Sequence, residues 1–196
     1  FTLAGDSKIG TQYYMGANGL DMGKQTNDSR PLEEYFGSGV ILDIQGAISG
    51  AGGLTKVGFD TVILSGANTY SGGTTITSGK LMVGRTNALP TTGNVTTNSN
   101  GVLDLNGYDQ TIGRLQNPSL PGVTGVASGF ISNSGSSTNT LTVGNGATGE
   151  YFYSGLIQGN VAINKVGSGN LVLTAVNTYT GKTVVTGGKL SIAGEV

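Results

Sequence analysis

The chain has 196 residues, of which 36 are Gly and only 11% are charged, and it contains no Cys, His or Trp. An average domain has roughly 25% charged residues and about 7% Gly. Gly, Thr, Ser and Asn disfavour helices and suit short strands and tight turns, so we expect an all-β fold. Its 36% of hydrophobic residues and its net charge of -1 argue against disorder.

Charge and the missing residue types exclude several functions. The 10 Lys and Arg against 11 Asp and Glu form no basic stripe, so we expect no nucleic-acid partner. Without His or Cys, neither a Ser-His-Asp or Cys-His site nor an ordinary zinc site can form. Asp is too sparse for the pattern of calcium-binding solenoids, so we expect no metal and no cofactor.

Membrane and targeting signals are also missing. No apolar run approaches the roughly 20 residues that cross a bilayer, and residues 1–6 lack the basic and apolar regions of a signal peptide. Because the chain starts without Met, we expect a mature product or an excised segment whose targeting signals lie elsewhere.

The first irregular stretch covers residues 22–39. Its charges and its Pro and Gly predict a loop thrown out from the body of the fold, where binding residues are often found. The candidate binding residues here are Lys24, Arg30, Glu33, Glu34 and Tyr35.

A long motif follows and occurs twice, in regions 46–84 and 155–194. An offset of 109 residues superposes residues 46–83 on 155–192 with 16 of 38 positions identical. Each copy alternates strands with Gly-rich turns, in which every second residue is apolar. The positions that we expect to maintain the repeat are Gly58, Asn68, Tyr70, Gly72, Gly79 and Leu81, matched by Gly167, Asn177, Tyr179, Gly181, Gly188 and Leu190.

Alternation assigns the side chains of the repeat to two sides of the sheet. Asn68 and Gly72 mark a turn, and we expect the Tyr70 ring to cover a bend at a coil end. We expect Lys80 and Lys189 to point outward, so that Lys80→Asp is nearly silent whereas Leu81→Asp costs several kcal/mol. The expected inward positions are Val62, Leu64, Leu81 and Val83, with Leu171, Leu173, Leu190 and Ile192 in the second copy.

Weaker strands are predicted just before the first copy, at residues 40–44, and between the copies, at residues 102–107 and 141–144. None could bury its apolar face alone, and stacking coils in register would complete one core, as in a parallel β-helix. Coils of about 20 to 25 residues would give roughly eight coils and a rod about 40 Å long. Residues 117–139 are rich in Pro, Ser and Gly and predict a second protruding loop, with Phe130 as a candidate binding residue.

Carboxylates and lysines are the remaining candidates for chemistry. Asp43 and Asp104 lie at outward positions in the middle of strands, where a polysaccharide-active β-helix enzyme could carry its acids. The alternative is that both are solvated residues that keep the sheet soluble. Lys56 recurs as Lys165, and recurrence favours a structural role because an active site is normally built once.

The repeat resembles the autotransporter-associated β-strand repeat of Gram-negative passenger domains. The resemblance is carried by the strings GLTKVG at 53–58, SGANTYSGGTT at 65–75 and GKLMVG at 79–84, and by LDLNGYDQTIG at 103–113. The second copy departs from this pattern at Ala175, Val176 and Lys182. The resemblance implies a right-handed β-helix exported from a longer precursor through a C-terminal outer-membrane barrel, which this sequence does not include.

These observations favour a non-enzymatic passenger segment over the enzyme alternative. We expect one β-helix segment over 1–196, displayed on the bacterial surface or secreted, that supports adhesion or receptor contact and export. Expected partners are a host cell-surface protein, matrix or other bacterial cells. We expect a monomer with weak end-to-end association, because solenoid ends expose sheet edges.

Overall fold

The computed structural model describes residues 2–3, 5–10, 41–117 and 129–193. These residues form strands joined by turns, and no helix occurs among them. The predicted loop 22–39, with Lys24, Arg30, Glu33, Glu34 and Tyr35, lies outside the described residues.

The strands are short, as expected for a chain in which Gly and Asn interrupt each apolar run. Their bounds are β1 Thr2–Leu3, β2 Ser7–Gly10, β3 Ile41–Ile44, β4 Ser49–Gly50, β5 Leu54–Val57, β6 Thr61–Leu64, β7 Thr74–Val83, β8 Val95–Asp104, β9 Gln110–Ile112, β10 Leu115–Gln116, β11 Phe130–Ser132, β12 Asn139–Val143, β13 Glu150–Tyr153, β14 Leu156–Gly159, β15 Val161–Lys165, β16 Asn170–Leu173, β17 Thr178–Tyr179, β18 Thr183–Val185 and β19 Lys189–Ile192.

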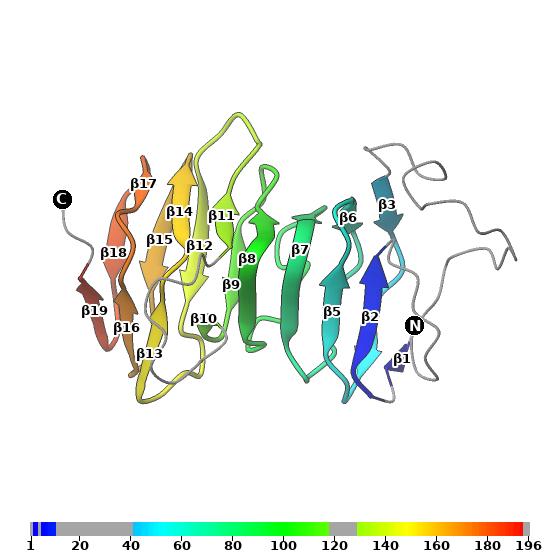
Figure 1. Ribbon diagram of the computed structural model, residues 1–196. Helices are drawn as coiled ribbons and strands as arrows, with labels where there is room; N and C mark the ends of the chain where they lie inside the picture. Colours follow the sequence, from blue (N-terminus) through cyan, green and yellow to red (C-terminus); the bar gives the residue numbers. More distant parts are fainter. Residues whose placement is uncertain (1, 4, 11–40, 118–128, 194–196) are drawn as a thin grey trace, which may run out of the picture.

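Every strand pair is parallel, and the coils stack along a rod from β1 to β19 (Figure 1). The rod has three faces. Face 1 contains β2, β5, the first halves of β7 and β8, β10, β13, β16 and β19. Face 2 contains β3, β6, the second halves of β7 and β8, β11, β14 and β17. Face 3 contains β1, β4, β9, β12, β15 and β18.

Where strand pairing stops, hydrogen bonds made by side chains and turns continue the stacking of the coils. On face 1, the Ser154 N–H donates to the Asn117 side chain at 2.5 Å, which joins β13 to the coil that carries β10. On face 3, the Thr69 N–H donates to the Ile48 carbonyl at 2.8 Å. The parallel β-solenoid predicted from the sequence is therefore confirmed.

The rod has about seven turns, slightly fewer than the eight expected. Partners on successive coils are commonly 20 residues apart, as Asn68 and Ile48 are. The insertion that contains 118–128 interrupts this period, since Val102 pairs with Phe130 on the next rung. At about 4.8 Å per rung, seven turns give a rod of roughly 34 Å.

The two copies of the repeat lie on different faces. In the first copy, β5 and the start of β7 are on face 1, whereas the matching β15 and β18 are on face 3. Likewise β6 is on face 2 and its counterpart β16 is on face 1. The copies are thus not a whole number of turns apart, so the repeated residues encode the geometry of a coil rather than one binding face.

The apolar core runs the length of the rod and contains the inward positions predicted from alternation. Val62, Leu64, Leu81 and Val83 are buried, as are Leu171 and Leu173. Val62, Leu81 and Leu103 stack on successive rungs of face 2, so like side chains lie above like. Leu190 is only partly buried and Ile192 is 64% exposed, because no described coil covers β19.

Turn residues of the repeat make contacts between coils. The Asn68 side chain accepts from the Ile48 N–H at 2.7 Å and donates to the Ala88 carbonyl at 2.8 Å, so it joins three coils. Asn177 repeats the first contact with the Ile157 N–H at 2.8 Å. Tyr70 does not lie over a coil end as expected but is fully buried, with its hydroxyl 2.6 Å from that of Thr74.

At two positions of the motif, the structure leaves no room for any residue other than Gly. Gly79 has φ +66°, and a Cβ there would lie 2.4 Å from the Gly58 carbonyl oxygen. Gly72 lies so close to the neighbouring coil that a Cβ would be 2.3 Å from the Gly53 nitrogen. The positive φ recurs at Gly58, Gly167 and Gly188, and close approach recurs at Gly181.

The prediction that residues 117–139 form a second protruding loop is partly wrong. Phe130–Ser132 forms β11, which pairs with β8 and β14 and places Ile131 in the core. This strand was not predicted because it has only three residues, which is too few for alternation to be recognised, and because Pro, Ser and Gly surround it. Deleting 117–139 would therefore remove a rung of face 2.

Candidate interaction surface

The two carboxylates considered as catalytic acids lie on one outward row of face 2. Asp43 pairs with Ile63, Ile63 with Met82 and Met82 with Asp104. Three rungs separate the carboxylates by about 14 Å. Glycosidases need their two carboxyl groups about 5 to 9.5 Å apart, so this pair does not form such a site.

Asp104 is buried, which contradicts the expectation of a solvated residue. The turns that follow β8 and β11 fold over it, and its Oδ1 accepts from the Asn106 N–H at 2.9 Å and the Ser134 N–H at 2.8 Å. Its Oδ2 lies 3.1 Å from Lys80 Nζ. Asp43 is exposed and accepts from the Ser65 hydroxyl at 2.6 Å. Asp104 is therefore a structural anchor between two turns.

The contribution of Asp104 to the free energy of unfolding should be lost at acid pH. Burial alone raises the pKa of Asp104, but bonds from the Ser134 and Asn106 N–H groups and from Lys80 outweigh burial and lower the pKa below 3.8. The stabilisation is thus fully present above pH 3.8 and is lost as pH falls through the lowered pKa. We expect Asp104→Asn to lower the free energy of unfolding at neutral pH. The further decrease of this free energy toward acid pH, which we call the acid limb, should be smaller in the variant.

Urea unfolding followed by circular dichroism across this pH range measures both effects. Asp43→Asn, at an exposed position on the same row, is the matched control, and it should destabilise the rod less than Asp104→Asn at neutral pH. Equal acid limbs for wild type and Asp104→Asn would contradict the buried anchor.

The recurrent lysines Lys56 and Lys165 belong to the scaffold, as their recurrence predicts. Both are fully buried. The Lys56 ammonium donates to the carbonyls of Val57 and Gly58, each at 2.8 Å, and of Ser78 at 3.2 Å on the next coil. Lys165 donates in the same way to Val166, Gly167 and Gly187. Burial lowers the pKa of Lys56 to about 8, with Asp60 opposing, and also lowers that of Lys165.

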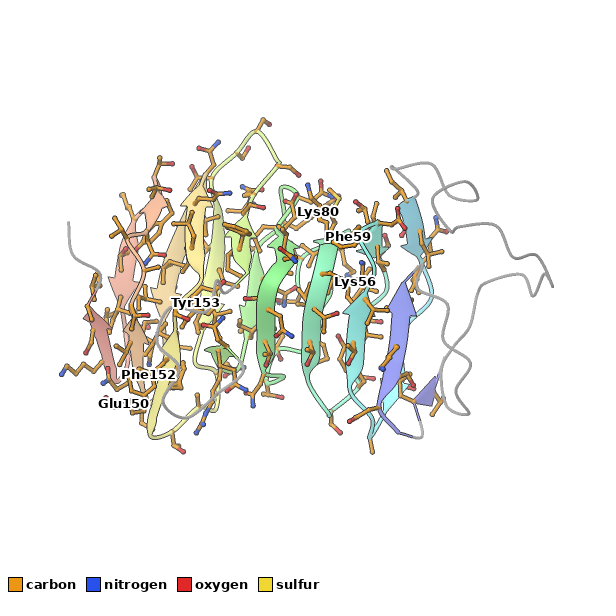
Figure 2. The ribbon with its side chains drawn as sticks, in the orientation of Figure 1. Lys56, Phe59, Lys80, Glu150, Phe152 and Tyr153 are labelled. Atoms are coloured by element: carbon orange, nitrogen blue, oxygen red, sulfur yellow. The ribbon has the colours of Figure 1, made fainter. Side chains whose placement is uncertain are left out.

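Face 2 carries outward apolar side chains on several successive coils. Ile41 is 63% exposed and Phe130 is 36% exposed on this face, while Phe59 is 80% exposed in the turn that leads into β6. Figure 2 labels Phe59 and Lys80 in the upper part of the view. Four half-buried apolar residues lie in two outward rows of the same face. Ile63 and Met82 lie in the row of Asp43, and Val102 and Leu156 lie in the row of Ile41 and Phe130. We call this set of seven apolar residues the face 2 stripe.

The outer surfaces of the other two faces are mainly polar. On face 1, Thr55, Thr75 and Thr96 pair in one outward row. On face 3, Thr111, Thr142 and Asn164 do the same, although Val184 follows them on the last coil. Exposed apolar side chains therefore also occur on these faces, at Val184 and at Phe152 on β13, but over fewer successive coils than on face 2.

Phe130 is one of the binding residues predicted from the sequence, whereas Ile41 and Phe59 were not predicted. The signal was present in residues 40–44, 61–64 and 81–83, where apolar residues follow one another instead of alternating. In a strand with one buried side, a continuous apolar run means that some of its side chains face outward.

Neither a metal centre nor a spanning helix is found in the described part of the chain. No group of three His, Cys, Asp or Glu lies close enough together there to hold an ion. None of these residues forms a helix with the length and hydropathy that a membrane span needs.

Comparison with known proteins identifies the repeat. The passenger-associated-transport-repeat family matches residues 54–83 and 163–192, which are the two copies described above. The adhesin BmaC autotransporter of Brucella suis biovar 1 (strain 1330) is 34% identical over 151 residues, which cover 76% of this chain and 4% of that protein. No solved structure matches. The chain therefore contains two passenger-associated transport repeats and is distantly related to an autotransporter adhesin.

Proposed function

We propose that this chain is a non-enzymatic stalk segment of a surface-displayed or secreted passenger, and that it supports adhesion through the face 2 stripe. The observation that carries this proposal is the stripe itself, which lies on a rod related to an adhesin. Buried apolar surface supplies most of the free energy of protein association, and exposed apolar patches of this kind often mark binding sites.

The scaffold suits such a role because it presents the stripe on rigid strands. Each rung is tied to the next by backbone bonds, by Asn68 and Asn177, and by the two buried lysines. A surface held in this way loses little conformational entropy when it binds. The proposed partners are a host cell-surface protein, matrix or other bacterial cells. Residues 22–39, with Lys24, Arg30, Glu33, Glu34 and Tyr35, remain a second proposed contact region.

Passage of the precursor across the outer membrane is a further part of the proposal. The matched family takes its name from passenger transport. Coils that stack one on another outside the cell form hydrogen bonds that cannot form in transit, and this gain opposes backsliding of the chain.

A binding assay with a triple variant tests the adhesive role. We expect Ile41→Thr, Phe59→Ser and Phe130→Thr together to weaken binding to epithelial cells or immobilised matrix at least tenfold, about 1.4 kcal/mol. The variant should melt within a few degrees of wild type, since all three side chains are exposed.

The matched control removes exposed aromatic residues that lie off the stripe. Tyr108→Ser with Phe152→Ser changes side chains that are 39% and 54% exposed, and Phe152 lies on β13 of face 1. This control should bind as wild type does. Equal losses in the two variants, or no loss in the triple variant, would contradict a role for face 2.

A further inference from the structure

The dipeptide Asn-Gly occurs at residues 18–19, 100–101, 106–107 and 145–146. Asn followed by Gly is prone to spontaneous deamidation, because Gly has no side chain that hinders attack by its own backbone nitrogen on the Asn side chain. Residues 18–19 lie outside the described residues, and the other three pairs lie in different surroundings. The fold therefore gives three identical dipeptides different reactivities.

Two of these three pairs are held in ways that hinder the reaction. Gly101 is buried within β8, and a Cβ there would lie 2.2 Å from the Ile76 carbonyl oxygen. The Gly107 N–H donates to the Asn133 side chain at 2.8 Å, so the Gly107 nitrogen is not free to attack Asn106. Each of these pairs can react only after its local structure opens, and opening costs free energy.

The third pair, Asn145 and Gly146, lies in the turn between β12 and β13, which the bond from the Ala147 N–H to the Gly144 carbonyl closes at 3.0 Å. Gly146 is exposed, and a Cβ there would have no atom beyond its chain neighbours within 4 Å. Its N–H makes no hydrogen bond with the described residues. The Asn145 amide makes one exposed bond, to the Thr91 carbonyl at 3.1 Å, for which water competes. Both reacting groups are thus accessible in the folded chain.

We propose that Asn145 is a self-modification site, at which the folded chain converts Asn to aspartate and isoaspartate with time. The backbone nitrogen of Gly146 attacks the side-chain carbonyl carbon of Asn145. A bond forms between these two atoms, the bond to the side-chain nitrogen breaks, and that nitrogen leaves as ammonia with the proton of the Gly146 N–H. Water then opens the resulting cyclic imide at either of its carbonyls, which gives aspartate or isoaspartate without any oxidant or reductant.

The isoaspartate product loosens this corner of the rod. Isoaspartate adds a methylene to the main chain, and the turn has little room for it. The Gly169 N–H donates to the Ala147 carbonyl at 3.1 Å, and a Cβ at Gly167 would lie 2.0 Å from the Gly144 carbonyl oxygen. A longer turn must therefore give up contacts with the following coil. This consequence does not depend on the adhesive role of face 2.

Peptide mass spectrometry of the folded chain, stored in neutral and in mildly alkaline buffer, tests the site. We expect Asn145 to deamidate at least about tenfold faster than Asn100 or Asn106, since each factor of ten corresponds to about 1.4 kcal/mol of local opening at the protected pairs. The rate should rise with pH, because the attacking nitrogen must lose its proton. The same chain in concentrated urea is the reference, where the three pairs should react at similar rates.

Two variants separate the consequences of the modification. Asn145→Gln forms the cyclic imide slowly, because its ring would be larger, so it should keep its melting temperature on storage while wild type loses stability. Asn145→Asp supplies the charge without the extra methylene, so the fresh variant should melt closer to fresh wild type than stored wild type does. Labelling by an isoaspartyl methyltransferase with S-adenosylmethionine measures the isoaspartate in each sample.

Three results would overturn the proposal. The first is deamidation of the folded chain that is as fast or faster at Asn100 or Asn106. The second is a rate at Asn145 that falls as far below its value in urea as the rates of the other two pairs, which would mean that the turn protects Asn145 as well. The third is stored wild type that contains isoaspartate at this position and still melts as Asn145→Gln does, which would refute the loosened corner.

Discussion

Leu81→Asp is expected to lower the free energy of unfolding by about 4 kcal/mol, because it buries an unpaired carboxylate and removes a well-packed apolar side chain. Leu81 is fully buried and stacks between Val62 and Leu103. A solenoid coil contacts only its neighbours, so the damage should be greatest in the adjacent coils that carry Val62 and Leu103. Urea unfolding measured by circular dichroism gives the free energy directly.

The neighbouring Lys80→Asp is no longer expected to be silent, in contrast to the prediction from alternation alone. Lys80 does point outward, but its ammonium pairs with the buried Asp104. Replacing it by Asp would set two carboxylates against each other and cost about 2 kcal/mol. Thr75→Asp on the same strand is the matched outward control, and it should cost less than about 0.5 kcal/mol. Equal effects of Leu81→Asp and Thr75→Asp would refute the assignment of inward and outward sides.

Lys56→Met is expected to destabilise the rod by about 3 kcal/mol, the second-largest effect, because it leaves three carbonyl oxygens without their charged donor. Its pKa of about 8 means that the amine is charged at pH 7 and donates to all three acceptors. One acceptor, Ser78, lies on the next coil, so the variant should weaken the cohesion between coils.

The control for this variant is Lys182→Met, which removes an exposed lysine and should stay within about 0.5 kcal/mol of wild type. Lys165→Met should act in the same direction as Lys56→Met, since Lys165 makes the matching contacts. Thermal and urea melts of the three variants provide the comparison. If the melts of Lys56→Met and Lys182→Met coincide, the hydrogen bonds from Lys56 to the three carbonyl oxygens contribute nothing to stability.

Much of the fold could be read from local patterns in the sequence. Alternation located the inward residues of β6, β7 and β16, and the Gly and Asn of the repeat located the turns between them. These features depend on only a few neighbouring residues, which is why the sequence reports them. β11 escaped notice because its three residues are stabilised by β8 and β14 rather than by a pattern of their own.

The candidate surface was less predictable. Phe130 was named for its place in an irregular stretch, yet it lies on a strand, and it contributes to a stripe whose other members come from six other segments of the chain. Which outward residues remain exposed depends on the turns of adjacent coils. Asp43 and Asp104 share one outward row, but only Asp104 is covered by neighbouring turns.

The sequence by itself determined that this chain forms parallel coils, and that Lys56, Gly79 and their counterparts serve the scaffold, because a repeat records what every coil needs. Only the tertiary structure decided which face each copy occupies, which carboxylate is buried, and where apolar side chains gather on the surface. Those properties depend on how many strands and insertions separate two coils, and no local pattern carries that count.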